Sequence, residues 1–372
     1  MSTLTDLART LEDVSCLDDS ALTRALYSTD ASLYRVVPQM VARPRDVAEL
    51  GAVVDAALGL GIPITGRGAG TSCAGNAVGT GLVIDCARHL NRILDIDPEA
   101  RTATVEPGVV QAALQAAAAP YGLRFGPDPS TSSRCTIGGM IGNNACGPRA
   151  LGYGRSADNV VALDVITGTG QRLRLDADTS FSELKSLVAA NLGVIRTEFG
   201  TFSRQVSGYS MEHLLPERGF DVAKFFAGTE GTLGIITSAT VRLVADAPVA
   251  LMVALGYPDM AEAADDIAHL LRFSPTACEG LDARIVEVVR RAGRPVPELP
   301  RGEGWMFIEL VGEDTGEVTQ RAHELLTAAS ALEGWVVDDP ALAKALWKIR
   351  EDGAGLAGVS LPNPAYGGWE DA

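Results

Sequence analysis

Short apolar runs with alternating helical and strand spacing follow one another through the first two thirds of the chain. Residues 1–35 carry leucines at helical spacing and are predicted to form a helical lead-in. A helix over 47–60 follows, which Asp46 caps and Glu49 completes as a capping box. The segments after it are predicted, in order, as strands over 63–65, 82–85, 93–97 and 102–106 and a helix over 109–119.

The apolar pattern then predicts a hairpin and, farther on, a second folding unit. Residues 160–167 and 171–175 alternate on either side of a Gly-Thr-Gly turn, and Ser180 with Glu183 is read as a capping box for a helix that runs to Leu192. After a strand over 235–243, Asp246-Ala247-Pro248 marks a boundary. Beyond it the pattern has ferredoxin-like α+β texture: strand 250–255, helix 260–273, strand 306–311 and helices 315–332 and 341–350.

Two glycine-rich stretches interrupt these patterns. Residues 127–159, PDPSTSSRCTIGGMIGNNACGPRALGYGRSADN, show almost no helical or strand periodicity, so their backbone is expected to lie against a large ligand. The earlier stretch, GRGAGTS at 66–72, follows a predicted strand and could present successive N–H groups to phosphate. Its glycines do not match G-x-G-x-x-G and the next element is predicted to be a strand, which argues against a Rossmann nicotinamide site.

Composition narrows the functional classes. The formal net charge of −16 argues against nucleic acid or an anionic membrane as a general partner. The six cysteines form no C-x-x-C pair, which favours reduced thiols over disulfides or an iron–sulfur site. With no signal peptide pattern and no transmembrane segment, the expected location is cytoplasmic, or peripheral at the inner membrane through a partner.

Four motifs occur in one order: GRGAGTS, the 127–160 stretch, FAGTEGTLGIIT and LWKIRE. Together they resemble the FAD-binding oxidoreductases of the vanillyl-alcohol oxidase/p-cresol methylhydroxylase (PCMH) type, in the branch of the D-2-hydroxyacid dehydrogenases. The segments CTIGGMIGNNACG, VSGY and HLLPERGF resemble the corresponding segments of long bacterial members that carry an iron–sulfur domain. The resemblance implies an α+β fold: a two-subdomain PCMH-type FAD-binding domain at 36–247 and part of a ferredoxin-like cap at 248–372.

The resemblance also implies the cofactor, FAD, and the residues that bind it. Because Thr71 stands where covalent members have the flavin-linking histidine, FAD is expected to be non-covalent. The implied cofactor-binding residues are Arg67, Gly68, Ala69, Gly70, Thr71, Ser72, Gly75 and Asn76 around the pyrophosphate; Pro127, Asp128, Thr131, Gly138, Gly139, Asn143, Asn144, Gly147, Tyr153, Gly154 and Val160 along the flavin; and Glu230, Gly231, Gly234, Ile235 and Thr237 near the adenosine.

Two residues are candidates for the substrate side. Arg350 matches the arginine that holds the substrate carboxylate in the branch, although by spacing alone it would be an exposed arginine at a helix C-terminus. Tyr209 could hydrogen-bond a substrate oxygen or simply pack in its loop. The four histidines, His89, His213, His269 and His323, lack ligand spacing and are expected to be surface or helix residues, so no metal site is predicted.

The implied reaction is oxidation of a D-2-hydroxy acid of the D-lactate, D-2-hydroxyglutarate or glycolate class to the 2-oxo acid by an FAD-dependent dehydrogenase acting on CH–OH donors. Electrons would pass to an iron–sulfur domain or protein, a quinone or an electron-transfer flavoprotein. The chain stops inside the resembled cap, so it is expected to be C-terminally truncated. The alternatives are a non-catalytic flavin-binding fragment or subunit that acts only in a complex, and an FAD/NADPH reductase of the same fold.

Overall fold

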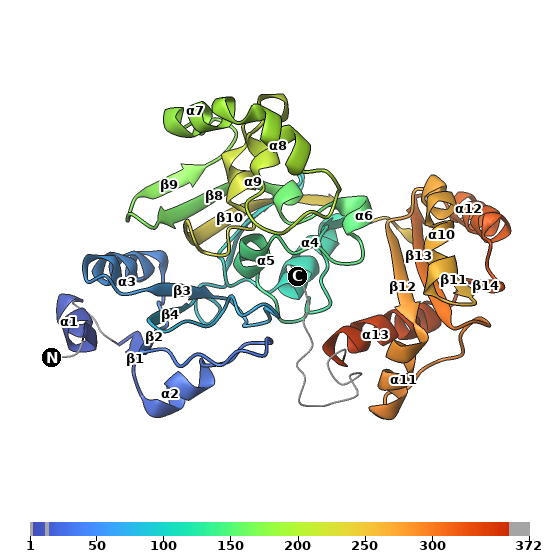
Figure 1. The fold of residues 1–372 in the computed structure, drawn as a ribbon, viewed down its shortest axis with the longest axis horizontal. Coiled ribbons are helices and arrows are strands. Elements are labelled where there is room, and N and C mark those ends of the chain that lie inside the picture. The colour runs from blue at the N-terminus through green and yellow to red at the C-terminus, as the bar shows by residue number, and fades with distance from the viewer. Residues whose placement is uncertain (1–2, 12–14, 357–372) are drawn as a thin grey trace. The chain divides into compact units, whose positions relative to one another are not determined.

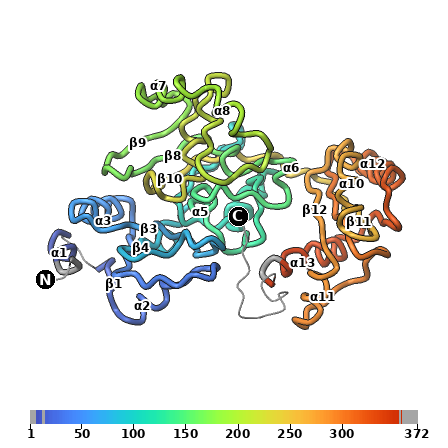
Figure 2. The backbone as a smooth tube through the Cα atoms, in the orientation of Figure 1, coloured from blue at the N-terminus to red at the C-terminus, as the bar shows by residue number. Residues whose placement is uncertain are grey.

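The computed structural model describes residues 3–11 and 15–356, and these form two compact units (Figure 1). The first unit comprises the described residues up to Cys146 together with Gly154–Val244. The second comprises Gly147–Tyr153 and the described chain from Ala245 onward. The backbone trace in Figure 2 shows the same course of the chain. The short segment 147–153 therefore lies in the C-terminal unit, although both of its flanks lie in the first.

A four-stranded sheet opens the first unit, with strand order β1-β2-β4-β3. Strands β3 and β4 are parallel, and the next regular element after the first glycine stretch is a strand, as predicted. Helix α3 packs Leu50, Val53 and Val54 into the core of this sheet. The elements are α1 (Thr3–Thr10), β1 (Leu17–Asp18), α2 (Ala21–Leu26), β2 (Met40–Ala42), α3 (Val47–Gly59), β3 (Ile64–Arg67) and β4 (Leu82–Asp85).

A six-stranded sheet of order β5-β6-β10-β8-β9, with β7 paired to β10, carries the larger core of this unit. Apolar residues of α4, α5 and α9 pack together in that core with residues of β6, β8 and β10. The strands are β5 (Ile93–Asp97), β6 (Thr102–Val105), β7 (Leu123–Phe125), β8 (Val160–Thr167), β9 (Arg172–Leu175) and β10 (Gly234–Ala245). The helices are α4 (Gln111–Ala118), α5 (Ile137–Asn143), α7 (Ser182–Ala190), α8 (Leu192–Glu198) and α9 (Val222–Phe226).

The second unit is an antiparallel sheet of order β12-β13-β11-β14 with helices on both faces (Figure 1). Alternate residues of β11 face opposite cores: Val253 and Leu255 pack with α10 and α12, while Met252 and Ala254 pack with α11 and α13. The ferredoxin-like texture is confirmed, and the structure adds β12, α11 and β14, which the sequence pattern did not predict. The elements are α6 (Ala150–Tyr153), β11 (Val249–Tyr257), α10 (Met260–Leu270), β12 (Ala277–Asp282), α11 (Ala283–Arg291), β13 (Gly304–Gly312), α12 (Thr315–Ala328), β14 (Glu333–Val337) and α13 (Pro340–Leu356).

Two local predictions are wrong. The capping box of Ser180 and Glu183 does not form: α7 begins at Ser182, after Phe181, and has no side-chain cap. Phe181 occupies the N-cap position instead and packs against the large core. The long glycine stretch was expected to lack regular structure, but it contains helix α5. The Asp46 cap on α3 does form, with its side chain accepting from Glu49 N.

Candidate functional site

Helix α5 lies at the centre of the glycine-rich stretch and has one apolar face and one face almost without side chains. Thr136 caps it, with Oγ1 accepting from Gly139 N at 3.3 Å. Ile137, Met140 and Ile141 recur at helical spacing and are buried. A Cβ built on Gly142 would meet no other atom within 4 Å. The helix is therefore anchored by its apolar side, and its backbone borders open space at Gly142.

The loop of the FAGTEG motif is hydrogen-bonded to the backbone of α5. Gly228 N donates to Ile141 O at 2.8 Å, and Glu230 N donates to Gly142 O at 2.9 Å. Glu230 adopts a left-handed conformation with φ 54°, which is unfavourable for a residue with a side chain. A Cβ at Gly231 would also meet nothing within 4 Å. The Glu230–Gly142 hydrogen bond thus places two glycines with open space around them, Gly142 and Gly231, on neighbouring backbone segments.

The first glycine stretch contacts α5 at both of its ends. Asn76 Nδ2 donates to Asn143 Oδ1 at 2.6 Å, which joins the loop of residues 67–77 to the helix. A side chain on Gly68 would clash with the Thr136 hydroxyl, so the loop lies directly against the cap of α5. The structure therefore brings members of each of the three predicted groups of cofactor residues together around one short helix.

This arrangement fits FAD. A diphosphate and a flat ring system need backbone that they can approach without Cβ clashes, and Gly142 and Gly231 provide such positions beside the amide-bearing Asn143. The predicted cofactor residues that lie in the first unit are Arg67, Gly68, Ala69, Gly70, Thr71, Ser72, Gly75, Asn76, Pro127, Asp128, Thr131, Gly138, Gly139, Asn143, Asn144, Gly154, Val160, Glu230, Gly231, Gly234, Ile235 and Thr237.

Several of these side chains are already engaged within the protein. Thr237 Oγ1 donates to Asp164 O at 3.0 Å, and Asn144 Oδ1 accepts from Ala157 N at 2.9 Å. The Tyr209 hydroxyl lies 2.7 Å from Thr232 Oγ1, and its ring packs edge-on against Phe225. Tyr209 thus contacts α9 and the FAGTEG segment, and it is 39% exposed, so its proposed contact with a substrate oxygen stays a prediction.

The other predicted site residues lie in the second unit. Gly147 and Tyr153 belong to the segment 147–153, where Gly152 N donates to Thr276 O at 3.1 Å. Arg350 lies on α13, and its Nε donates to Glu279 Oε2 on β12 at 2.8 Å. Its Nη1 and Nη2 atoms have no hydrogen-bond partner in the part of the chain that the structure describes.

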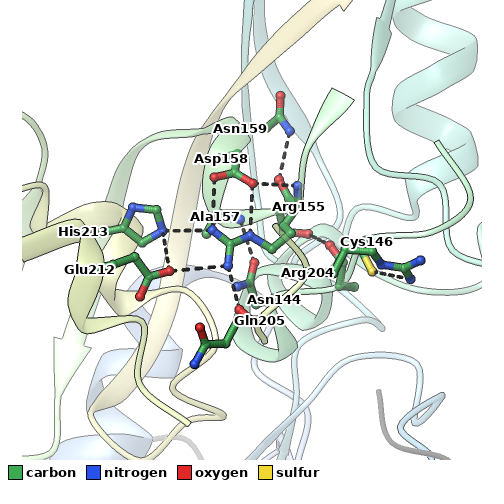
Figure 3. Close-up of polar contacts among 12 residues, drawn as sticks. Asn144, Cys146, Arg155, Ala157, Asp158, Asn159, Arg204, Gln205, Glu212 and His213 are labelled. Carbon is green, nitrogen blue, oxygen red and sulfur yellow. Dashed lines mark hydrogen bonds and ion pairs between the residues drawn. The ribbon is translucent and has the colours of Figure 1, made fainter. Parts of the chain in front are cut away.

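A buried charge cluster, which the sequence did not reveal, holds the end of the long glycine stretch (Figure 3). Arg155 is 5% exposed, and it pairs with Asp158 at 3.1 Å and with Glu212 at 3.4 Å. Its Nη1 also donates to Gln205 O at 2.6 Å, and His213 Nε2 lies 3.5 Å from Nη2. Burial alone would raise the pKa of Asp158, but hydrogen bonds and the charge of Arg155 lower it. No local spacing predicts the cluster, because Arg155 and Glu212 are 57 residues apart.

Of the two places expected for a histidine, the surface or a helix, His213 takes the second. It lies in a 3₁₀ turn at Met211–Leu214 and is buried. Burial lowers its pKa, although Glu212 acts in the opposite direction. Residues 3–11 and 15–356 contain no group of three His, Cys, Asp or Glu side chains placed to hold a metal ion. Over the same residues, no helix combines the length and apolar character needed to span a bilayer.

Sequence comparisons indicate FAD as the cofactor. Residues 38–176 match the model of the FAD binding domain, and residues 247–367 match that of the FAD linked oxidases, C-terminal domain. The chain is 28% identical to a D-2-hydroxyglutarate dehydrogenase of Pseudomonas putida over 90% of this chain and 37% of the relative. It is 29% identical to the glycolate oxidase subunit GlcD of Escherichia coli over 89% of this chain and 60% of the relative.

A third relative is a D-lactate dehydrogenase of Archaeoglobus fulgidus, 30% identical over 73% of this chain and 52% of the relative. The chain thus spans roughly a third to three fifths of the length of these relatives. Among solved structures, an alkyldihydroxyacetonephosphate synthase matches with a TM-score of 0.68 at 17% identity, covering 95% of this chain and 63% of that chain. This likeness concerns the fold.

The Arg155 cluster yields a prediction about stability. Replacing Arg155 with leucine leaves the carboxylate of Glu212, which is 2% exposed, without its cationic partner. We therefore expect the free energy of unfolding to fall by about 3 to 5 kcal/mol. Urea unfolding followed by circular dichroism measures the change. As a control, Arg174→Leu removes an exposed ion pair to Asp164 and should cost less than about 1 kcal/mol. A loss for Arg155→Leu as small as that of the control would contradict the buried cluster.

The lowered pKa of His213 predicts a pH dependence. The folded protein resists protonation of this imidazole, whereas the unfolded chain takes up the proton near pH 6.5. The stabilisation is therefore present above that pH and is lost as the pH falls below it. The free energy of unfolding, measured with urea at pH 7.5, 6.5 and 5.5, should fall as the pH falls. In the His213→Gln variant this dependence on pH should be weaker. The exposed His89, changed to Gln, is the control and should leave the slope as in the wild type.

Proposed function

We propose that this chain acts as an FAD-linked oxidase, which oxidises a D-2-hydroxy acid to the 2-oxo acid with non-covalent FAD as the hydride acceptor. The relatives named D-2-hydroxyglutarate dehydrogenase, glycolate oxidase subunit and D-lactate dehydrogenase support a substrate of this class. The proposal covers the substrate, the electron acceptor and the roles of individual residues.

The observation that carries the proposal is the hydrogen bonding of the Arg350 guanidinium. Glu279 engages only its Nε, so the guanidinium is oriented on α13 while both terminal nitrogens keep their donors available. The side chain is 23% exposed, so solvent reaches it. Two parallel N–H groups match the two oxygens of a carboxylate. Arg350 is therefore proposed to hold the carboxylate of the 2-hydroxy acid.

Arg149 shows the contrasting use of an arginine in the same unit. Its Nε and Nη2 both bind the buried carboxylate of Glu309, and its guanidinium lies 5.9 Å from the centre of the Trp347 ring. Thr276 Oγ1 donates to the same carboxylate at 2.8 Å. This bidentate pair leaves little of the Arg149 fork for a ligand, so we assign Arg149 to the structure of the unit and Arg350 to the substrate.

The proposed division of labour follows from these groups. FAD supplies the hydride acceptor when it is bound. The backbone around α5 and the FAGTEG loop would orient the flavin, and Arg350 would fix the substrate by its carboxylate, so that the α-carbon is presented in one orientation. Electrons would then leave to a further acceptor, which an artificial dye replaces in an assay.

A dye-reduction assay tests the reaction. Wild-type protein mixed anaerobically with D-lactate, D-2-hydroxyglutarate or glycolate should lose its flavin absorbance and reduce an added dye with at least one of them. Flavin that stays oxidised with all three would favour the non-catalytic flavin-binding subunit. Reduction by NADPH instead would favour the reductase of the same fold.

Arg350→Ala should raise KM for the accepted hydroxy acid about 10- to 100-fold, because a charge-assisted bidentate contact is lost. Steady-state dye reduction measures KM and kcat separately. Lys348→Ala is the matched control: this lysine lies on the same helix and pairs with Asp352 on an exposed surface, so its KM should remain that of the wild type. An unchanged KM for Arg350→Ala would refute the assigned role.

Flavin attachment gives a separate prediction. Thr71 lies in the loop after β3, and its hydroxyl is a poor group for attachment to a flavin. Acid precipitation of the holoprotein should therefore leave the yellow colour in the supernatant. Colour that stays with the pellet after washing would contradict non-covalent binding.

A further inference from the structure

The segment between α2 and β2 has a defined fold of its own, although the sequence indicated only a lead-in. Residues 28–36 turn back on themselves: Thr29 forms a bridge with Arg35, and Val36 N donates to Ser28 O at 2.8 Å. The Asp30 carboxylate accepts from Ser32 N at 2.9 Å and from the Ser32 hydroxyl, which closes the tip of the turn. We refer to residues 28–36 as the N-terminal turn.

The N-terminal turn binds both ends of the first glycine loop, residues 68–77. Ala31 N donates to Gly70 O at 3.1 Å, near the start of the loop. Asp30 Oδ2 accepts from Ala77 N at 3.3 Å, at its end. Between these points the Tyr34 ring lies beside Gly75, where a built Cβ would be 2.6 Å from Cδ2, and Gly75 has φ +86°. The glycine loop is therefore held along its length by a segment more than 30 residues earlier in the chain.

Arg67 connects the N-terminal turn to the first glycine loop. Its Nη1 donates to Ala77 O and its Nη2 to Thr29 O, both at 3.0 Å. Its guanidinium also lies 5.2 Å from the centre of the Tyr27 ring. The Tyr27 hydroxyl in turn donates to Asp85 on β4, the strand beside Arg67. Each terminal nitrogen of Arg67 thus donates to a backbone carbonyl of the protein.

We propose that the N-terminal turn and Arg67 form a clamp that holds the glycine loop in its cofactor-binding shape before FAD arrives. In this proposal Asp30 and Arg67 are positioning residues, and the pyrophosphate is bound by the backbone of the loop. A ten-residue loop that is glycine-rich loses much conformational freedom on binding, so ordering it in advance strengthens binding. The proposal rests on the FAD site described above and is independent of the substrate.

Two variants test the clamp in the full-length protein: Asp30→Ala and Arg67→Leu. Each removes one of the connections to Ala77, so we expect the Kd for FAD to rise about 10-fold in each. Quenching of flavin fluorescence measures the Kd. Hydrogen exchange on the flavin-free protein measures the clamp directly, and the amides of residues 68–77 should exchange faster in both variants than in the wild type.

The controls remove comparable interactions elsewhere in the first unit. Asp97→Ala removes a turn aspartate that accepts from Glu99 N and Ala100 N, both at 2.9 Å. Arg172→Leu removes an arginine that pairs with Asp55 at 2.7 Å. Both controls should keep the Kd for FAD within about twofold of the wild type. If Asp30→Ala fails to fold, Asp30→Asn replaces it, because the amide cannot accept from both Ser32 and Ala77.

The outcomes separate the clamp from its rivals. Wild-type affinity and exchange in both variants would overturn the clamp. A loss of affinity confined to Arg67→Leu, with unchanged exchange over residues 68–77, would also overturn it, because Arg67 would then bind the phosphates directly. Wild-type protein that binds no FAD would refute the cofactor site, and the exchange measurement would still decide whether the clamp exists.

Discussion

The backbone hydrogen bonds around helix α5 are the constraint on which the cofactor site depends. Its carbonyls at Ile141 and Gly142 accept from Gly228 and Glu230, while the side chain of Asn143 receives the Asn76 amide. These partners come from segments more than 60 residues away on either side. A seven-residue helix with three glycines is weak by itself, so its buried apolar face and these contacts together must stabilise it.

Glycine serves two different purposes in this region. At Gly68 and Gly138 the missing side chain permits close packing, since a Cβ would collide with Thr136 or with the Pro107 backbone. At Gly142 and Gly231 it leaves space open to a ligand. A count of glycines does not distinguish these purposes, but the surroundings of each one do.

The arginines differ in how many of their donors the protein itself uses. Arg155 and Arg149 bind buried carboxylates, so their charges are compensated inside the fold. Arg67 binds two carbonyls and an aromatic ring, and we infer that it shapes a loop. Arg350 has one partner through Nε, and its fork is left for the proposed carboxylate. The availability of donors, rather than exposure alone, is what separates a structural arginine from a candidate ligand-binding one.

The sequence by itself determined most of the helices and strands, because helical and strand periodicity are local properties of the chain. It also determined the order of the glycine-rich motifs, and through their resemblance to a known family it indicated the cofactor. It predicted β4 and β5 to the residue and the ferredoxin-like texture of the second unit. Only the tertiary structure decided which polar side chains find hydrogen-bond partners within the protein. Thr29 and Arg67, or Arg155 and Glu212, are tens of residues apart, and only folding brings their charges and carbonyls within hydrogen-bonding distance. For the same reason the N-terminal lead-in became a proposed part of the cofactor site, and His213 became buried.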